Sequence, residues 1–393
     1  MTKTQSKIEK LILELSPNGV EFKKLGELED LDMIKLGRGE VISKNDLAKI
    51  PGDYPVYSSS ATGSGEFGRY GKYMFDDERI SWSIDGGGRF FYRPTHKYSV
   101  TNVSGWLKVN NTKALNTKYL YFVLSDAWMT KVFDYTKKAH PSVIRDEYKI
   151  PIPPLAIQEE IVKLLNSFTE LEAELEAELE ARKKQYEHYR TQLLTFDNAG
   201  STQWLPLDQV INFMNGKGHE KLIDENGKYI VVNSKFVSTD GRVKKYSVSQ
   251  ISPVFENDIL MVMSDLPNGK ALAKCFYVDE NDKYTLNQRI CALSVKNKDE
   301  IYSKYLFYIL SRNRQLLRYD NGADQTNLRK DDILKIQIPV PPLEEQKRIV
   351  SILDKFDDLV NNISIGLPAE LKARRSQYEY YRGKLLTFNE YVN

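Results

Sequence analysis

Two long segments of the chain carry apolar residues at the three- and four-residue spacing of an amphipathic helix. In the first segment, about residues 157–196, these positions are Ile161, Leu165, Phe168, Leu175, Leu179, Tyr186, Tyr189 and Leu193. In the second, about residues 344–388, they are Ile349, Leu353, Phe356, Val360, Ile363, Leu367, Leu371, Tyr378, Tyr381 and Leu385. Sustained spacing of this kind is typical of a coiled-coil seam. The sequence therefore predicts two helices of about 40 residues, each about 60 Å long at about 1.5 Å per residue.

The second helical segment contains an interruption that the first lacks. Its residues 366–369 read Gly-Leu-Pro-Ala, whereas the first segment continues through ELEAELEAELEA at 170–181. A proline inside a helix removes one hydrogen bond and clashes with the preceding turn. We therefore expect a kink, or a break and restart, near Pro368.

Short β-rich runs broken by glycine fill two blocks, one before the first helical segment and one between the two segments. They include YPVY at 54, RISWSIDGGGRFFYRP at 79, KYIVV at 228, DILMVM at 258 and QRICALSV at 288. Each block also contains one helical run, TKYLYFVLSD at 117–126 and SKYLFYILSR at 303–312, and these runs are alike. The pattern predicts an α+β fold class, with two similar globular α/β domains separated by a long antiparallel coiled coil of two helices.

The segments that flank the two blocks form an internal sequence repeat. IPPLAIQEEIV at 152–162 returns 188 positions later as VPPLEEQKRIV at 340–350, and RKKQYEHYRTQLLTF at 182–196 returns 192 positions later as RRSQYEYYRGKLLTF at 374–388. The end of the chain leads into the pattern that opens the first block, so we expect a pseudo-two-fold molecule whose termini lie close together. The expected divisions are a short N-terminal helix (1–16), a first domain (17–150), a first helical region (151–197), a second domain (198–338) and a second helical region (339–393).

The formal net charge of +2 conceals an uneven distribution along the chain. Residues 17–150 and residues 198–338 each carry 20 Lys and Arg against 17 Asp and Glu, whereas residues 157–197 carry 5 against 10. A strong nucleic-acid binder acting alone would usually be more basic, so we expect any affinity for DNA to be shared with partner subunits. No apolar run approaches the length of a membrane span, and we expect a cytoplasmic protein.

The sequence offers little that points to catalysis or to a metal site. Cys275 and Cys291 have neither disulfide-framework nor zinc spacing, and we expect reduced core residues in neighbouring strands. The four histidines show no ligand spacing. Residues 63–68 fit GxGxxG, but the Gly- and Tyr-rich stretch that follows is no dinucleotide-binding helix. Both Pro-Pro pairs lack the preceding Asn or Asp and the following aromatic residue that an adenine-methylating loop requires.

Polar and basic loop residues recur at matching places in both blocks and are the candidates for contact with DNA. Phosphates are bound by Lys, Arg and backbone N–H groups, and base edges by Arg, Asn, Gln and Lys. The candidates in the first block are Gly87, Arg89, Lys137, Lys138, His140 and Arg145. Those in the second are Lys217, His219, Arg242, Lys244, Lys245, Asn287, Gln288, Arg289, Gln325, Thr326 and Asn327. Any one of them alone could be a solvated loop residue.

The chain resembles the DNA-specificity subunits of type I restriction–modification systems. The resemblance is carried by IPIPPLAIQEEI at 150–161, IPVPPLEEQKRI at 338–349, the two QYE-x-YR-x-x-LLTF endings and YPVYSSSATGSGEFG at 54–68. The second copy has Glu345-Gln346 after its Pro-Pro-Leu, and the first departs slightly with Gln158-Glu159. The resemblance spans nearly the whole chain.

The resemblance implies a non-catalytic subunit in which each block is a target-recognition domain reading one half of an asymmetric, bipartite site. It implies that the helices set the unread gap and dock two methyltransferase subunits, and that endonuclease/translocase subunits join for cleavage. The residues expected at the docking surface are Pro154, Leu155, Gln158, Tyr186, Tyr189, Pro342, Leu343, Gln346, Tyr378 and Tyr381. No cofactor is expected on this chain, because S-adenosylmethionine would lie on the methyltransferase partner, which flips out an adenine.

Two other classes of protein remain open at this point. A coiled-coil scaffold could bind two protein or glycan ligands through its blocks, and it would show no sequence-dependent retention of DNA. A fused nuclease or methyltransferase would need catalytic residues, and the missing Pro-Pro-aromatic loop counts against it.

Overall fold

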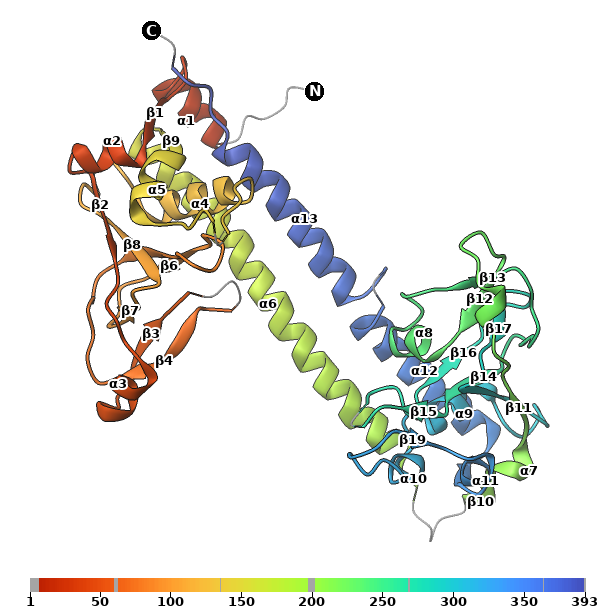
Figure 1. The fold of residues 1–393 in the computed structure, drawn as a ribbon. Coiled ribbons are helices and arrows are strands. Elements are labelled where there is room, and N and C mark those ends of the chain that lie inside the picture. The colour runs from red at the N-terminus through yellow and green to blue at the C-terminus, as the bar shows by residue number, and fades with distance from the viewer. Residues whose placement is uncertain are drawn as a thin grey trace, which may run out of the picture. The chain divides into compact units, whose positions relative to one another are not determined.

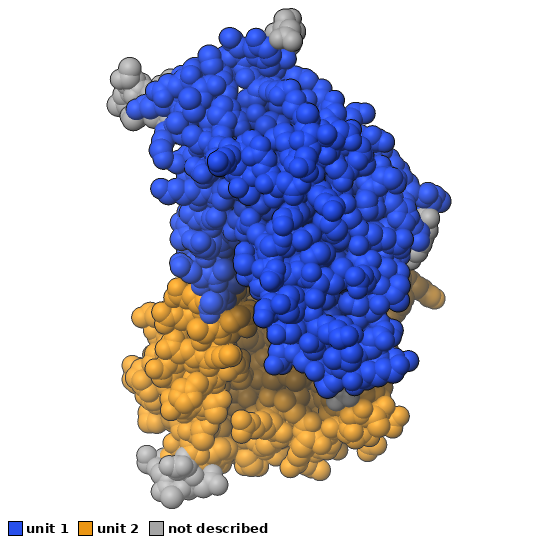
Figure 2. All heavy atoms as spheres, turned by 90° about the vertical axis from the view of Figure 1, so that its left-hand side faces the viewer, with its two compact units in different colours: residues 1–177, 370–393 blue, residues 178–369 orange. Residues whose placement is uncertain are grey.

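The computed structural model describes residues 7–59, 63–134, 136–196, 202–267, 269–362 and 364–391 (Figure 1). Expectations that fall on Ser60, Ala61, Thr62 and Ile363 lie outside the described residues. The chain divides into two compact units, residues 1–177 with 370–393 and residues 178–369 (Figure 2). Each unit therefore holds one of the two blocks together with parts of the helical segments.

The first unit is built on a four-stranded sheet with a smaller three-stranded sheet beside it. Its elements are α1 (Lys7–Leu15), β1 (Glu21–Lys24), α2 (Leu25–Asp30), β2 (Ile34–Arg38), α3 (Lys44–Lys49), β3 (Tyr54–Tyr57), β4 (Glu66–Tyr70), β5 (Arg79–Ser83), β6 (Phe90–Arg93), β7 (Ser99–Val100), β8 (Ser104–Val109), α4 (Thr117–Trp128), α5 (Pro141–Glu147) and β9 (Lys149–Ile152).

The second unit repeats this arrangement with its own elements. They are β10 (Gln203–Pro206), α7 (Leu207–Val210), β11 (Ile211–Asn215), the 3₁₀ turn η1 (Glu220–Leu222), β12 (Tyr229–Val232), α8 (Ser234–Ser238), β13 (Tyr246–Ser247), β14 (Ile259–Val262), β15 (Ser264–Asp265), β16 (Cys275–Tyr277), β17 (Tyr284–Leu286), β18 (Ile290–Val295), α9 (Ser303–Leu310), α10 (Arg314–Leu317), β19 (Thr326–Asn327), α11 (Lys330–Leu334) and β20 (Gln337–Val340).

The strand order is the same in both units, so the prediction of two copies of one domain is confirmed. The four-stranded sheets run β2-β8-β5-β6 and β11-β18-β14-β16, and the three-stranded sheets run β4-β3-β7 and β13-β12-β17. In each three-stranded sheet one pair is parallel, β3 with β7 and β12 with β17. The antiparallel pairs β1-β9 and β10-β20, each joining the beginning of a block to its end, complete the match, and β15-β19 occurs as a further pair in the second unit.

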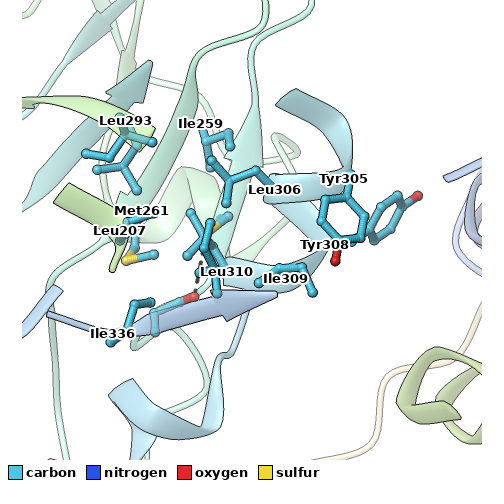
Figure 3. Close-up of a cluster of buried hydrophobic side chains, with 14 of the residues drawn as sticks. Leu207, Ile259, Met261, Leu293, Tyr305, Leu306, Tyr308, Ile309, Leu310 and Ile336 are labelled. Carbon is cyan, nitrogen blue, oxygen red and sulfur yellow. Dashed lines mark hydrogen bonds between the residues drawn. The ribbon is translucent and has the colours of Figure 1, made fainter. Parts of the chain in front are cut away.

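A helix covers one face of each four-stranded sheet and closes its core. In the second unit, Figure 3 shows Leu306 and Leu310 of α9 against Ile259 and Met261 of the sheet, and all four side chains are buried. Burial of aliphatic side chains contributes about 1.5–3 kcal/mol each. The corresponding helix of the first unit, α4, packs on β5 and β6.

The long helical segments form α6 (Leu155–Leu193), α12 (Leu343–Val360) and α13 (Leu367–Leu386). The 39 residues of α6 confirm the prediction of an uninterrupted helix at 157–196, whereas the second segment breaks after Val360 and restarts at Leu367. Pro368 is the second residue of α13, where the missing N–H costs no helical hydrogen bond. A Cβ atom at Gly366 would lie 2.2 Å from the carbonyl oxygen of Asp358, so the break requires glycine there.

Aromatic and charged side chains connect the helices inside each unit. In the first unit, Phe168 of α6 contacts Tyr378 and Tyr381 of α13, and Arg375 Nε of α13 donates to Glu172 at 2.6 Å. In the second, Phe356 of α12 packs against Tyr186 and Tyr189 of α6, with ring centroids 6.4 and 5.5 Å away. These contacts hold parts of the helical segments on each domain.

The two ends of the described chain meet in the first unit. The N–H of Val20 donates to Asn389 O at 2.9 Å, and the N–H of Tyr391 donates to Val20 O at 2.9 Å. The segment after the second LLTF ending thus joins the beginning of the first block, as the sequence predicts.

The two cysteines lie one strand farther apart than expected. Cys275 of β16 and Cys291 of β18 both pair with Met261 of β14, which runs between them. The prediction of neighbouring strands was therefore wrong, because β14, which precedes β16 and β18 in the sequence, lies between them in the sheet. Both thiols are free and buried, and burial raises the pKa of Cys291 to about 12.

Candidate nucleic-acid interface

Four segments of the second unit meet where strands of the four-stranded sheet end. The N–H of Met263 donates to Arg289 O at 3.0 Å, and the N–H of Leu328 donates to Met263 O at 2.7 Å. The N–H of Lys217 donates to Leu286 O at 3.1 Å. We call the residues joined in this way loop cluster 2: residues 215–219, 263–265, 286–289 and 325–328.

The first unit joins its own loops through the same hydrogen bonds. The N–H of Ile84 donates to Val103 O at 3.0 Å, the N–H of Ala139 to Ile84 O at 3.2 Å, and the N–H of Glu40 to Val100 O at 3.2 Å. We call these residues loop cluster 1: residues 38–40, 84–89, 100–103 and 136–140. One backbone frame therefore presents two different sets of side chains.

Loop cluster 2 gathers most of the candidate residues of the second block. Gln288 and Arg289 are exposed and, with Asn287, line a hollow of about 280 Å³ beside Lys235. The amide nitrogen of Gln288 donates to Glu220 Oε1 at 3.1 Å.

The opposite side of loop cluster 2 is formed by the β15-β19 pair. The amide nitrogen of Gln325 donates to Ser264 Oγ at 2.7 Å, and both Gln325 and Asn327 are exposed. Exposed amides and a guanidinium are the groups that read base edges.

Two candidates of the second block are buried. His219 is 1% exposed, with its ring nitrogens 2.7 Å from Lys217 O and 2.8 Å from Thr285 Oγ1. Thr326 is 7% exposed on β19. His219 lies in the polar loop that the sequence indicates, but this loop folds the imidazole onto β17 and away from solvent, so the side chain is not exposed for contact with DNA.

Three basic candidates lie on the segment after α8 rather than in loop cluster 2. Arg242, Lys244 and Lys245 are all exposed. Arg242 Nε donates to Thr239 O at 2.9 Å, and Lys245 O accepts from the N–H of Val231 at 2.8 Å. These cations can meet a phosphate backbone at the edge of β13, but they do not join the amides of the cluster.

Loop cluster 1 brings together Gly87, Arg89, Lys138 and His140. Lys138 Nζ lies 2.9 Å from Asp85 Oδ1, and Gly87 O accepts from Trp128 Nε1 at 2.6 Å. The guanidinium of Arg89 lies over the ring of Phe91, 5.1 Å from its centroid. Gly88 has φ +78°, and a Cβ atom there would lie 2.6 Å from Phe133 Cδ2, so this turn needs glycine.

The remaining two candidates of the first block are held by carboxylates. Lys137 pairs with Glu147, and this contact lowers the pKa of the Glu147 carboxyl. Arg145 pairs with Glu29 and with Asp30 Oδ1, the latter at 2.9 Å, and hydrogen bonds to these two acids raise the pKa of Arg145. Arg145 thus ties α5 to α2.

Comparison of the two clusters identifies residues that the sequence patterns did not single out. Asn102 precedes Val103 as Gln288 precedes Arg289, and Glu40 occupies the position of Lys217. Neither Asn102 nor Glu40 stands in a run of basic or amide residues. Only the matching backbone hydrogen bonds of the two clusters identify them as equivalent to Gln288 and Lys217.

The expected docking residues fall into two groups. Gln158 and Gln346 are 0% exposed, and Tyr186 is 8% exposed, so their side chains lie inside the protein. The other expected residues are at least partly exposed: Pro154, Leu155, Tyr189, Pro342, Leu343, Tyr378 and Tyr381.

Within the described residues, no group of three or more His, Cys, Asp or Glu side chains is placed to hold a metal ion. In the same residues, no helix is both long and apolar enough to cross a membrane.

Comparison with known proteins agrees with this repeated architecture. Residues 17–181 and 203–373 match the family described as type I restriction modification DNA specificity domain. The chain is 35% identical over 288 residues to the EcoR124I/EcoR124II specificity subunit of a type I restriction enzyme from Escherichia coli, covering 70% of this chain and 69% of the relative.

Two solved structures share the fold over nearly the whole length. One is the type I restriction–modification S subunit from M. genitalium, with a TM-score of 0.56, 19% identity and coverage of 94% of this chain and 96% of that one. The other comes from work on complex assembly and conformational transition of the type I R-M system, with a TM-score of 0.62, 14% identity and coverage of 94% and 98%.

Proposed function

The chain belongs to the type I restriction–modification DNA specificity family, and we propose that it reads an asymmetric, bipartite DNA site through its two domains. Such a subunit has two target-recognition domains, which we place at residues 17–150 and 198–338. The observation that carries the proposal is the doubled loop cluster. One hydrogen-bonded frame carries Gln288, Arg289 and Gln325 in one domain and unrelated residues in the other, as two unlike half-sites would require.

We propose that the exposed and partly exposed members of each cluster contact DNA. In the second domain these are Lys217, Asn287, Gln288, Arg289, Gln325 and Asn327, with phosphate contacts from Arg242, Lys244 and Lys245. In the first they are Gly87, Arg89, Lys138 and His140, together with Asn102. Lys137, Lys138 and Arg145 would reach phosphate only by leaving their acids, and His219 and Thr326 support the loops from behind.

The helical regions, residues 151–197 and 339–393, would pair along their length as an antiparallel coiled coil and set the unread gap between the half-sites. The within-unit contacts of Phe168 with Tyr381 and of Tyr189 with Phe356 support this pairing. One added helical turn is about 6 Å, comparable with about two base-pair steps of 3.4 Å.

The exposed part of the helical regions would dock two methyltransferase subunits, which carry S-adenosylmethionine and flip out an adenine. Pro154 and Pro342 are exposed at equivalent helix starts, and Tyr189 and Tyr381 are exposed at equivalent positions farther along. Docking at both copies would give two methyltransferases in equivalent settings. Endonuclease/translocase subunits would join this complex for restriction, with no catalytic group supplied by this chain.

The test is to co-express the chain with a type I methyltransferase subunit and to sequence the modified adenines in the host DNA. The proposal predicts one bipartite, asymmetric motif with a fixed gap, which disappears when this chain is omitted. A scaffold that binds proteins or glycans would yield no motif.

A further inference from the structure

A polar cavity of about 640 Å³ lies in the second unit, between the C-terminal part of α6, α9 and the segment that follows α8. Its volume falls in the range of small-molecule sites, about 300–1,000 Å³. Among its lining residues are Lys183, Arg190, Arg242, Arg312, Phe307 and Tyr308. No described member of loop cluster 2 lines it, so the cavity is separate from the proposed DNA-reading surface.

The repeat shows that one charge in this region is reversed. Arg190 and Arg382 occupy the same place in the two QYE-x-YR endings. In the first unit, Arg382 Nε donates to Asp126 Oδ1 at 2.9 Å. Asp126 ends the run TKYLYFVLSD, and the matching run SKYLFYILSR ends in Arg312. In the first unit, Asp126 neutralises Arg382. At the position of Asp126, the second unit has Arg312, a second positive charge.

The two arginines of the second unit are held by neutral main-chain oxygens. Arg190 Nη2 donates to Tyr308 O at 3.1 Å and to Ser311 O at 2.7 Å. Arg312 Nη1 donates to Leu272 O at 3.2 Å, and its backbone has φ +58°. In the described part of the chain, neither has an acid oxygen within 4.0 Å.

The acids of the cavity leave this positive charge in place. Asp240 lies 2.7 Å from Lys274 Nζ and is neutralised there. Asp357 Oδ1 accepts a hydrogen bond from Asn361 Nδ2 at 2.8 Å, and burial raises the pKa of this carboxyl. Glu187 also lines the cavity and is exposed to solvent.

We propose that this cavity binds a small phosphorylated ligand of mononucleotide size. A guanidinium matches a phosphate with two parallel hydrogen bonds, and Arg190 and Arg312 would both supply such donors. The rings of Phe307 and Tyr308 line the same cavity and offer apolar surface for a base or another flat group. The corresponding site of the first unit is closed by its own ion pair, so we expect one ligand per chain.

The experiment is calorimetric titration of the full-length chain with ADP in the absence of metal ions. The expected result is saturable binding at one site. In Arg312→Asp, an acid returns to the position that Asp126 holds in the first unit, and aspartate tolerates the positive φ of this residue. Its carboxylate would pair with Arg190, so affinity should fall about 10-fold or more, with an unchanged or higher melting temperature.

Arg190→Gln provides a second variant and should also weaken binding by about 10-fold or more. The matched control is Arg382→Gln, which removes the equivalent arginine of the first unit and should leave ADP affinity unchanged. The proposal is overturned by absence of saturable ADP binding to the wild-type chain, or by wild-type affinity in both second-unit variants. Displacement of bound ADP by one equivalent of double-stranded oligonucleotide would also overturn it, because the cavity would then belong to the path of the DNA.

Discussion

Phe168 of α6 stacks on Tyr381 of α13, with ring centroids 5.6 Å apart and an angle of 21° between the rings. The two residues are more than 200 positions apart in the sequence, and both lie on the apolar stripes that predicted the long helices. Their contact joins the beginning of one helical region to the end of the other inside the first unit. Removing this stack therefore tests how the end of the chain is held on the first domain.

Replacing Phe168 with Ala should destabilise the first unit by about 1–3 kcal/mol, because the ring loses its contacts with both tyrosines. Urea denaturation followed by tyrosine and tryptophan fluorescence measures the change. Leu171→Ala is the control on the same helix, since Leu171 is 45% exposed. Equal stability of the two variants would show that the stack contributes nothing.

Gln158 and Gln346 should prove essential for folding rather than for docking. The Gln158 side chain accepts from the N–H of Asn116 at 2.8 Å and donates to the carbonyls of Ala114 and Pro153. Gln346 makes the same three bonds with Tyr302, Glu300 and Pro341.

A leucine at either position would leave these backbone groups buried and unpaired. We expect Gln158→Leu to cost about 2–4 kcal/mol, measured by chemical denaturation. Gln377→Leu, at an exposed position of α13, should be nearly neutral. A Gln158→Leu chain of normal stability that fails to bind methyltransferase would instead assign the residue to docking.

Arg289→Ala and Gln325→Ala should each impair recognition of one half-site while leaving the fold intact. Loss of one good base contact reduces discrimination by about 1–3 kcal/mol, or roughly 10- to 100-fold. Methylation rates on duplexes with single-base changes in either half-site measure the effect. Lys298→Ala, at an exposed loop position outside loop cluster 2, is the control. Unchanged specificity in both variants would remove this cluster from the reading surface.

Asp357 should make the second unit less stable as pH rises. Burial is the main cause that raises the pKa of its carboxyl above the ordinary 3.8. In the interval between the ordinary and the raised pKa, the folded chain holds a proton that the unfolded chain releases. This stabilisation is complete below the ordinary pKa and is lost as pH rises through the raised value.

Asp357→Asn should therefore raise the melting temperature at neutral pH by about 1–4 °C and change it little near pH 4. Thermal denaturation across this pH range measures the difference. Asp358→Asn, its exposed neighbour, should show no comparable pH dependence. A lower melting temperature for Asp357→Asn at neutral pH would mean that the ionised carboxylate is stabilising.

The helices and the repeat could be predicted because their signals are local or periodic. The spacing of residues such as Leu165 and Leu353 indicates a helix without knowledge of its partner, and both are fully buried. The break before Leu367 followed from Pro368 and the residues around it. The meeting of Val20 with Asn389 followed from the way the repeat closes on itself.

The candidate surface could be predicted only in part, because it is assembled by pairings between distant strands. The parallel pairing of β12 with β17 places Thr285 beside His219, and no sequence pattern near His219 predicts their hydrogen bond. Lys138 and Arg145 look equivalent in sequence, yet Lys138 pairs with Asp85 of its own loop cluster, whereas Arg145 pairs with Asp30, more than 100 residues away. The convergence of Arg289 with Gln325 likewise depends on the backbone of Met263.

Exchange of residues 198–338 for the corresponding block of another specificity subunit is the most direct test of two independent reading domains. The exchanged chain is co-expressed with the methyltransferase, and its modified motif is sequenced in host DNA. The account predicts that one half of the motif changes while the other half is retained. A change in both halves, or in neither, would contradict it.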